Sequence, residues 1–210
     1  MNLSLVLCFV PSVAVGMVCA LRKTLRWQEV LLAAATGLVV FVPIILLQFL
    51  TGGLPLFKSR ALISVLFRAL VFNGVIEETI KMLGIALLGA GRKKSLAAGT
   101  AQAAVAGLVL GGFETAAYFI AGYRNILLRL CTAVVIHCEG AVLSSFSVRS
   151  GAVGRRCWRS FVLAILIHGV YNFFAGFAPP IRWFSVAAIL LGALECRIAY
   201  RKLAGKDAEP

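Results

Sequence analysis

Charged residues are scarce in this 210-residue chain, and acidic residues are the scarcest of them. Only 14% of the residues are charged, with 8 acidic against 21 basic side chains, whereas 61% are hydrophobic. That composition excludes an ordinary soluble domain and is typical of a membrane protein with several spans. In a soluble chain, the net charge of +13 would indicate nucleic-acid binding. Here we attribute it to the basic cytoplasmic loops of membrane proteins, and we expect a lipid bilayer and no nucleic-acid partner.

Several familiar signals are absent. The six cysteines form no CxxC pair and no zinc-finger spacing, so we expect them to be reduced packing residues. The apolar run at residues 3–21 has its basic residues after it, which argues against a cleaved signal peptide and favours a retained first span. No soluble domain or low-complexity segment interrupts the chain. We therefore expect a single transmembrane domain over residues 1–210, with a disordered tail at 201–210.

The apolar runs predict an all-α bundle of about seven transmembrane helices, because a bilayer core needs about 20 apolar residues per helix. These runs lie at residues 3–21, 30–51, 62–90, 96–121, 125–148, 160–178 and 181–199. One set of alternate connections carries 13 lysines and arginines and the other carries 4. By the positive-inside rule, the richer set and the C-terminus lie in the cytoplasm, and the N-terminus lies outside.

Ionisable side chains occur inside these predicted spans. Translocon scales put the cost of a central Asp, Lys or Arg at about 2.5 to 3.5 kcal/mol, so such residues are candidates for function by default. Two of the glutamates fall outside the candidate site: we expect Glu139 to point away from His137, and Glu195 to pair near the cytoplasmic face. Three arginines close to span ends are expected to extend toward the membrane surface: Arg68, Arg129 and Arg197.

The stretch "EETIK" places a lysine one helical turn after two adjacent carboxylates. Lys81 is four residues after Glu77 and three after Glu78, so it can neutralise one carboxylate while the other exchanges a proton. In "ILIHGVYNFF", His168 and Asn172 share a helix face in the same way.

The stretch "GLVLGGFETAAY" combines a glutamate with closely spaced glycines. Glu114 and Tyr118 are four residues apart, so the phenol is expected to hold the carboxylate. Gly107, Gly111 and Gly112 would let another helix or a peptide approach the backbone closely. Together with His137 in mid-span, these groups predict one buried polar site built from four helices.

Four motifs in this order resemble those of the PrsW family of intramembrane proteases: "EETIK", "GLVLGGFETAAY", "RLCTAVVIH" and "HGVYN". That family is similar to the CAAX prenyl endopeptidases and to bacteriocin-processing membrane proteases. The resemblance covers about residues 70–175. It departs from the family pattern after Glu114, where Thr115 replaces the common asparagine, and at Leu110, where the family has an aromatic residue.

The resemblance implies an intramembrane endopeptidase with its catalytic core at about residues 62–178. Glu77 and Glu78 would activate a water for attack on the scissile carbonyl, and Lys81 would set their charge. The remaining site residues would stabilise the oxyanion, ligate or orient: Glu114, His137, His168 and Asn172.

Participation of a metal is left open by the motifs. Two histidines and a glutamate form a known catalytic zinc set, and the candidate ligands are Glu114, His137 and His168. However, HExxH is absent, and the ligands would come from separate helices. We therefore expect a glutamate-dependent mechanism with no obligatory metal.

The closest resemblance implies regulated proteolysis of a membrane-protein substrate, a single-span anti-sigma factor, in the bacterial cytoplasmic (inner) membrane. Two alternatives use the same residues. A proton- or cation-coupled transporter would use the carboxylates and histidines as a relay. A CAAX-type prenyl-protein endopeptidase would use the same chemistry on prenylated carboxyl termini.

Overall fold

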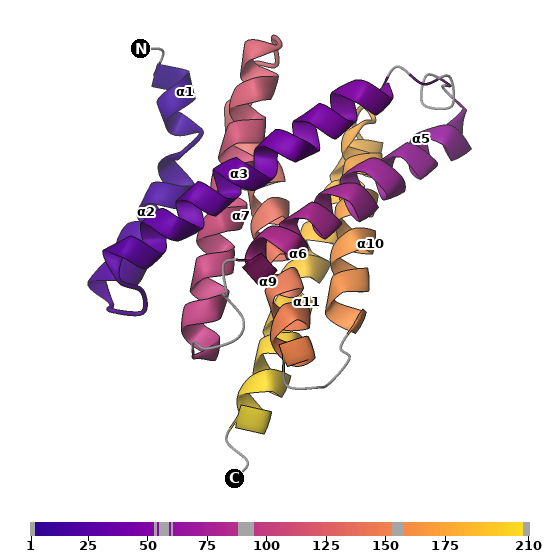
Figure 1. Ribbon diagram of the computed structural model, residues 1–210. Helices are drawn as coiled ribbons and strands as arrows, with labels where there is room; N and C mark the ends of the chain where they lie inside the picture. Colours follow the sequence, from indigo (N-terminus) through magenta and orange to yellow (C-terminus); the bar gives the residue numbers. More distant parts are fainter. Residues whose placement is uncertain are drawn as a thin grey trace.

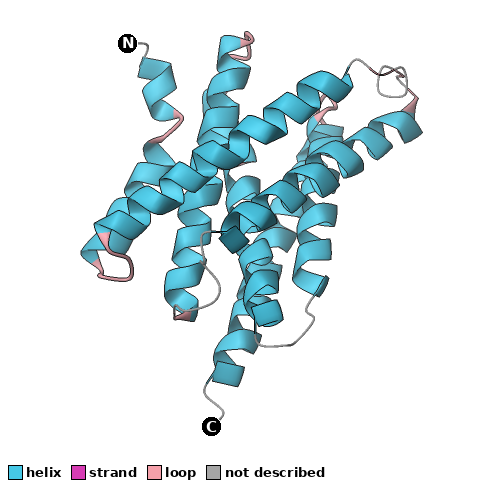
Figure 2. Cartoon of the chain, viewed as in Figure 1, coloured by secondary structure: helices cyan, strands magenta, loops and turns pink. Residues whose placement is uncertain are grey.

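The computed structural model describes residues 3–52, 54, 59, 61–87, 95–152 and 158–207, and every regular element within these residues is helical (Figures 1 and 2). The all-α prediction is therefore confirmed for this part of the chain. In chain order the elements are α1 (Leu3–Leu7), α2 (Val10–Leu21), α3 (Trp27–Gly52), α5 (Leu62–Arg68), the π-helix η1 (Ala69–Ile76), α6 (Glu77–Leu87), α7 (Leu96–Ile120), α8 (Ile126–Cys131), α9 (Ala133–Ala152), α10 (Trp158–Ala175), the short 3₁₀ helix η2 (Ile181–Trp183) and α11 (Phe184–Asp207).

Five segments of the described chain are long and apolar enough to cross a membrane. They are Trp27–Gly52, Leu96–Ile120, Ile126–Ser150, Trp158–Ala175 and Ile181–Gly205. These support five of the predicted spans. The predicted span 3–21 is divided into α1 and α2. The predicted span 62–90 is described as far as Leu87, where α5, η1 and α6 follow one another without a break. The orientation of the bundle in a membrane stays a prediction.

Helix α9 lies at the centre of the bundle, where it packs against α6, α7, α10 and α11. Helix α3 runs obliquely across α7 and alongside the continuous segment α5–η1–α6 (Figure 1). The two ends of the chain lie at opposite ends of the bundle in the same view. This arrangement brings residues of α3, α6, α7, α9 and α10 to one central region.

Glycines set the close contact between α7 and α9. A Cβ atom added to Gly107 would lie 2.5 Å from the carbonyl oxygen of His137, and one at Gly111 would lie 2.9 Å from Cα of Val134. At Gly112 it would meet the carbonyl oxygen of Cys8 at 2.8 Å. The predicted close approach of another helix to these glycines is confirmed, and it seats His137 directly against α7.

A second pair of glycines joins α10 to the π-helical segment. A Cβ on Gly74 would lie 2.8 Å from the carbonyl oxygen of Ile165, and one on Gly169 would lie 3.0 Å from Cα of Leu70. His168 directly precedes Gly169 in the chain, so this packing carries its side chain to the start of α6. A π-helix widens the local turn and is frequent at functional sites, and here it leads directly into Glu77.

The C-terminal prediction needs a correction, since α11 continues to Asp207 and residues 201–207 are helical rather than a disordered tail. Tyr200, Leu203 and Ala204 pack against the main apolar core, which extends the helix past the span. Residues 208–210 lie outside the described residues. Of the five described cysteines, all of them free, Cys8 is buried and Cys131 is exposed, so Cys131 is not the packing residue that we expected; Cys157 lies outside the described residues.

Candidate active site

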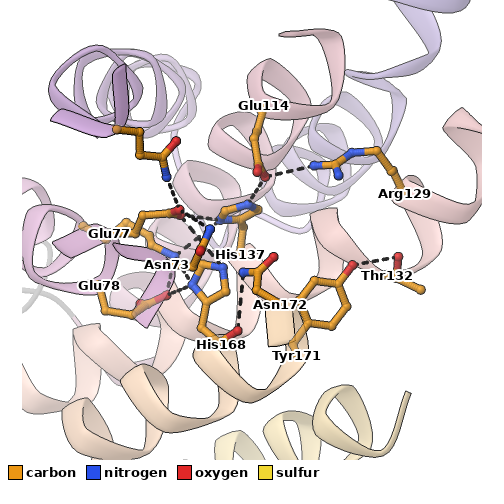
Figure 3. Close-up of polar contacts among 12 residues, drawn as sticks. Asn73, Glu77, Glu78, Glu114, Arg129, Thr132, His137, His168, Tyr171 and Asn172 are labelled. Carbon is orange, nitrogen blue, oxygen red and sulfur yellow. Dashed lines mark hydrogen bonds and ion pairs between the residues drawn. The ribbon is translucent and has the colours of Figure 1, made fainter. Parts of the chain in front are cut away.

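Glu77 belongs to a buried polar cluster, and only 2% of its surface is exposed (Figure 3). Its Oε1 accepts hydrogen bonds from Gln48 Nε2 at 2.7 Å and from Asn73 Nδ2 at 3.1 Å. Its Oε2 lies 3.9 Å from His137 Nδ1 and 3.9 Å from His168 Nε2. Two amides thus fix one carboxylate oxygen and leave the other facing two imidazoles.

Glu78 points into a separate, fully buried contact with Lys81 and His168. The Lys81 ammonium donates to Glu78 Oε1, and His168 Nδ1 lies 2.6 Å from the same oxygen. Lys81 therefore pairs with one carboxylate of the adjacent pair, and proton exchange at the other stays a prediction. A carboxylate accepts hydrogen bonds, so His168 Nδ1 carries the proton in this contact and Nε2 presents its lone pair toward Glu77.

Glu114 holds the second imidazole. Its Oε2 bonds to His137 Nε2 and lies 3.1 Å from Arg129 Nη2 (Figure 3). Each histidine of the cluster therefore has one ring nitrogen bound to a carboxylate and the other turned toward Glu77. Such a carboxylate contact fixes the orientation and tautomer of an imidazole.

Two predictions about Glu114's surroundings are wrong. Arg129 does not extend toward the membrane surface; its guanidinium turns inward to Glu114 and lies 3.9 Å above the Tyr118 ring. Tyr118 therefore supports the arginine rather than holding the carboxylate with its phenol. The position of Arg129 depends on how the helices pack. Helix α8 ends at Cys131, next to Thr132, and this places Arg129 against the end of α7.

Gly140 on α9 makes room for the Glu78 carboxylate. A Cβ atom at this position would lie 2.6 Å from Oε1 and 2.7 Å from Oε2 of Glu78. Glu78 Oε2 is buried and has no hydrogen-bond partner among the described residues. The absence of a side chain at Gly140 is thus a requirement of the site.

Glu139 and Glu195 lie outside the cluster, as predicted. The Glu139 carboxylate is buried beside Gly192 of α11, on the far side of α9 from His137. Glu195 lies 3.5 Å from Arg159. Both carboxylates are therefore useful controls for the glutamates of the cluster.

A cavity of about 510 Å³ adjoins the cluster. Asn73, Arg129 and Asn172 all line it, and the first two also contact the glutamates described above. Asn172 Nδ2 donates a long hydrogen bond of 3.4 Å to the carbonyl of His168. The cavity therefore gives a bound molecule access to the amide of Asn172 and to the side of the cluster that holds Glu77.

A set of metal-capable side chains is present in the described part of the chain: Glu77, His137 and His168, whose ligand atoms lie within 4.8 Å of one another. The predicted set contained Glu114 in place of Glu77. In a tetrahedral zinc site, bonds of about 2.0 to 2.1 Å place ligand atoms about 3.4 Å apart, so the set needs a modest contraction. His137 Nδ1 also lies 3.4 Å from the Lys81 ammonium, which competes for the lone pair that a metal would use.

Sequence reasoning missed three residues of the site. Gln48 lies in the predicted span 30–51 and outside the predicted catalytic core of 62–178, yet it bonds to Glu77. Asn73 is four residues before Glu77, a helical spacing that could have revealed it. Gly140 lies three residues after His137, and only the fold shows what it faces.

Comparison with known proteins identifies one relationship. The sequence model of a family described as "PrsW family intramembrane metalloprotease" matches residues 25–194 of the chain. This range includes every residue of the cluster, Gln48 among them. Neither the curated proteins nor the solved structures contain a significant match to the chain.

Proposed function

The chain belongs to the PrsW family of intramembrane metalloproteases, and from that premise we propose that it cleaves a membrane-anchored protein by means of water activated at Glu77. The observation that supports this proposal is the convergence of Glu77 Oε2 with His137 Nδ1 and His168 Nε2, at 3.9 Å each, inside the helix bundle. A water held between these atoms would lie out of bulk solvent beside a carboxylate base. Such an arrangement suits general-base hydrolysis of a peptide bond.

In the proposed reaction, Glu77 takes a proton from water as the water oxygen bonds to the scissile carbonyl carbon. The carbonyl oxygen becomes an oxyanion, which the amide of Asn172 is placed to stabilise. Collapse of the tetrahedral intermediate breaks the C–N bond, and Glu77 returns the proton to the leaving amine. Donors of this kind contribute about 2.7 to 4 kcal/mol to transition-state binding in other hydrolases.

The other charged residues orient the imidazoles in this proposal. Glu78, neutralised by Lys81, holds His168 at Nδ1, and Glu114, paired with Arg129, holds His137 at Nε2. Glu78 and Glu114 are each matched by a basic residue, which limits the electrostatic cost of burying these four charges.

We propose that the metal is not obligatory. Glu77, His137 and His168 are the residues that would hold a zinc ion, which when bound would make its water a nucleophile at neutral pH. The Lys81 ammonium beside His137 Nδ1 opposes such a site, because it donates to the same lone pair and carries like charge.

The substrate class that we propose is a single-span membrane protein, with an anti-sigma factor in the bacterial cytoplasmic membrane as the specific case. In the predicted topology, the cavity opens toward the non-cytoplasmic side. Its lining includes Tyr123 and Arg182, which belong to the predicted outer connections and follow α7 and α10 respectively.

Reconstitution in proteoliposomes tests the proposal. The purified chain is combined with single-span substrates, and products are identified by mass spectrometry, while solute flux is followed in parallel with and without a pH gradient. We expect two fragments from a cut within or next to the span and no coupled flux. Coupled flux without any peptide product would contradict the proposal and indicate a transporter.

A further inference from the structure

The cavity beside the cluster is lined by basic side chains and, among its described residues, by no acidic one. The basic side chains are Arg68, Arg129 and Arg182. The rest of the lining combines three tyrosines and other polar or aromatic residues with aliphatic ones such as Val65, Leu128 and Val186. A cavity with this charge favours an anionic ligand, because arginine pairs with carboxylates through its planar fork of N–H donors.

Among the described residues, Arg182 lacks the acidic partner that Arg129 has. Its Nε donates to the carbonyl oxygen of Phe177 at 2.9 Å, which positions the guanidinium but leaves its charge unbalanced. No acidic side chain pairs with Arg182 within the part of the chain that the structure describes. Arg129, in contrast, is already paired with Glu114.

The cavity connects Arg182 to the cluster along α10. Asn172 lies one turn after His168, and Arg182 follows the end of the helix at Ala175. From His168 to Ala175 the helix rises about 10 Å, a distance that an extended peptide covers with about three residues. Arg182 Nε is bonded to the carbonyl of Phe177, only two residues beyond Ala175. A peptide whose scissile bond lies at Glu77 would therefore pass this guanidinium with about its third or fourth residue from that bond.

We propose that this cavity binds the substrate segment next to the scissile bond and selects an aspartate or glutamate three or four residues from the cut. The inference rests on the proposed proteolytic function. A peptide is favoured over a lipid headgroup because the inner lining, Asn73 and Asn172, also adjoins Glu77 and His168, so the chain that reaches the cluster also passes Arg182.

The test compares two enzymes with two substrates in proteoliposomes. The enzymes are the wild type and Arg182→Gln; the substrates are one cleaved single-span protein with an acidic residue at the proposed position and its Asp→Asn or Glu→Gln variant. We expect kcat/KM for the acidic substrate to fall about tenfold in Arg182→Gln, with the neutral substrate changing less than about twofold. Arg182→Lys, which keeps the charge, restores most of the difference, and Arg182→Glu prefers a lysine-bearing substrate.

Three outcomes would overturn the inference. An equal loss on both substrates would assign Arg182 a merely structural role, through its bond to Phe177. Equal cleavage of both substrates by the wild type would show that the cavity does not select charge. A difference between wild type and Arg182→Gln that disappears in vesicles of neutral lipid would assign the arginine to anionic lipid. In each case the substrates are still cleaved, whereas failure of the proposed function would leave every substrate intact.

Discussion

Replacement of Gly140 by alanine should slow cleavage strongly while leaving the bundle folded. The added Cβ would lie 2.6 and 2.7 Å from the two Glu78 carboxylate oxygens, well inside van der Waals contact. Glu78 is 0% exposed, so its carboxylate cannot retreat into water. It has to move within the core, away from Lys81 and His168.

The magnitude follows from opposing effects. Alanine stabilises a helix over glycine by about 1 kcal/mol, whereas overpacking a tight core costs about 1 to 3 kcal/mol, so the net loss of stability is about 2 kcal/mol at most. Hydrogen bonds to charged groups contribute about 1.5 to 3 kcal/mol each. Misplacing the Glu78 contact that orients His168 should therefore lower kcat by about 10- to 100-fold.

The assay measures the initial rate of cleavage in proteoliposomes together with the thermal unfolding midpoint in detergent. Gly205→Ala is the matched control, since it adds the same methyl group to a helical glycine with nothing within 4 Å of the new Cβ. We expect the control to keep wild-type cleavage. Cleavage by Gly140→Ala within twofold of wild type would refute the role given to the Glu78 contact.

Three further predictions concern the surroundings of the cluster. Gln48→Leu removes the 2.7 Å bond to Glu77 and should lower the cleavage rate about tenfold. The control Gln102→Leu, which removes a buried amide that donates to the carbonyl of Glu29, should not; equal effects would deny Gln48 a specific role. Arg129→Gln should lower the rate at least tenfold and Tyr118→Phe should leave it unchanged, and a loss in Tyr118→Phe alone would restore the phenol to the role predicted from sequence. Prolonged chelation should leave the rate within twofold; a loss that zinc alone reverses, with matching metal content, would establish a metalloenzyme.

Helical spacing and motif order were enough to predict the inner members of the cluster. Glu77, Glu78 and Lys81 share a turn, and the glycines of α7 indicated the helix contact that brings His137 to Glu114. These contacts lie within one helical turn or depend on close helix packing, and small residues in the sequence indicate such packing. The pairing of Lys81 with Glu78 rather than Glu77, however, depends on which way each carboxylate faces in the folded bundle.

The residues that we did not predict lie far along the sequence from the groups that they contact. Gln48 meets Glu77 because α3 lies obliquely against α6, a crossing that hydropathy does not encode. Arg129 looked like a residue at a span end, but the break between α8 and α9 directs it inward. The π-helical stretch within residues 62–87 could not be predicted either, since its 8 residues are too few to change the hydrophobic period of the run.

The account depends most on Glu77 as the group that activates water, and one matched pair of variants tests it directly. Glu77→Gln and Glu139→Gln each neutralise a buried glutamate, one inside the cluster and one on the opposite side of α9. Both proteins are reconstituted in equal amounts with one single-span substrate, and the fragments are quantified by mass spectrometry. We predict wild-type cleavage by Glu139→Gln and no fragments from Glu77→Gln; fragments at the normal rate from Glu77→Gln would contradict the account.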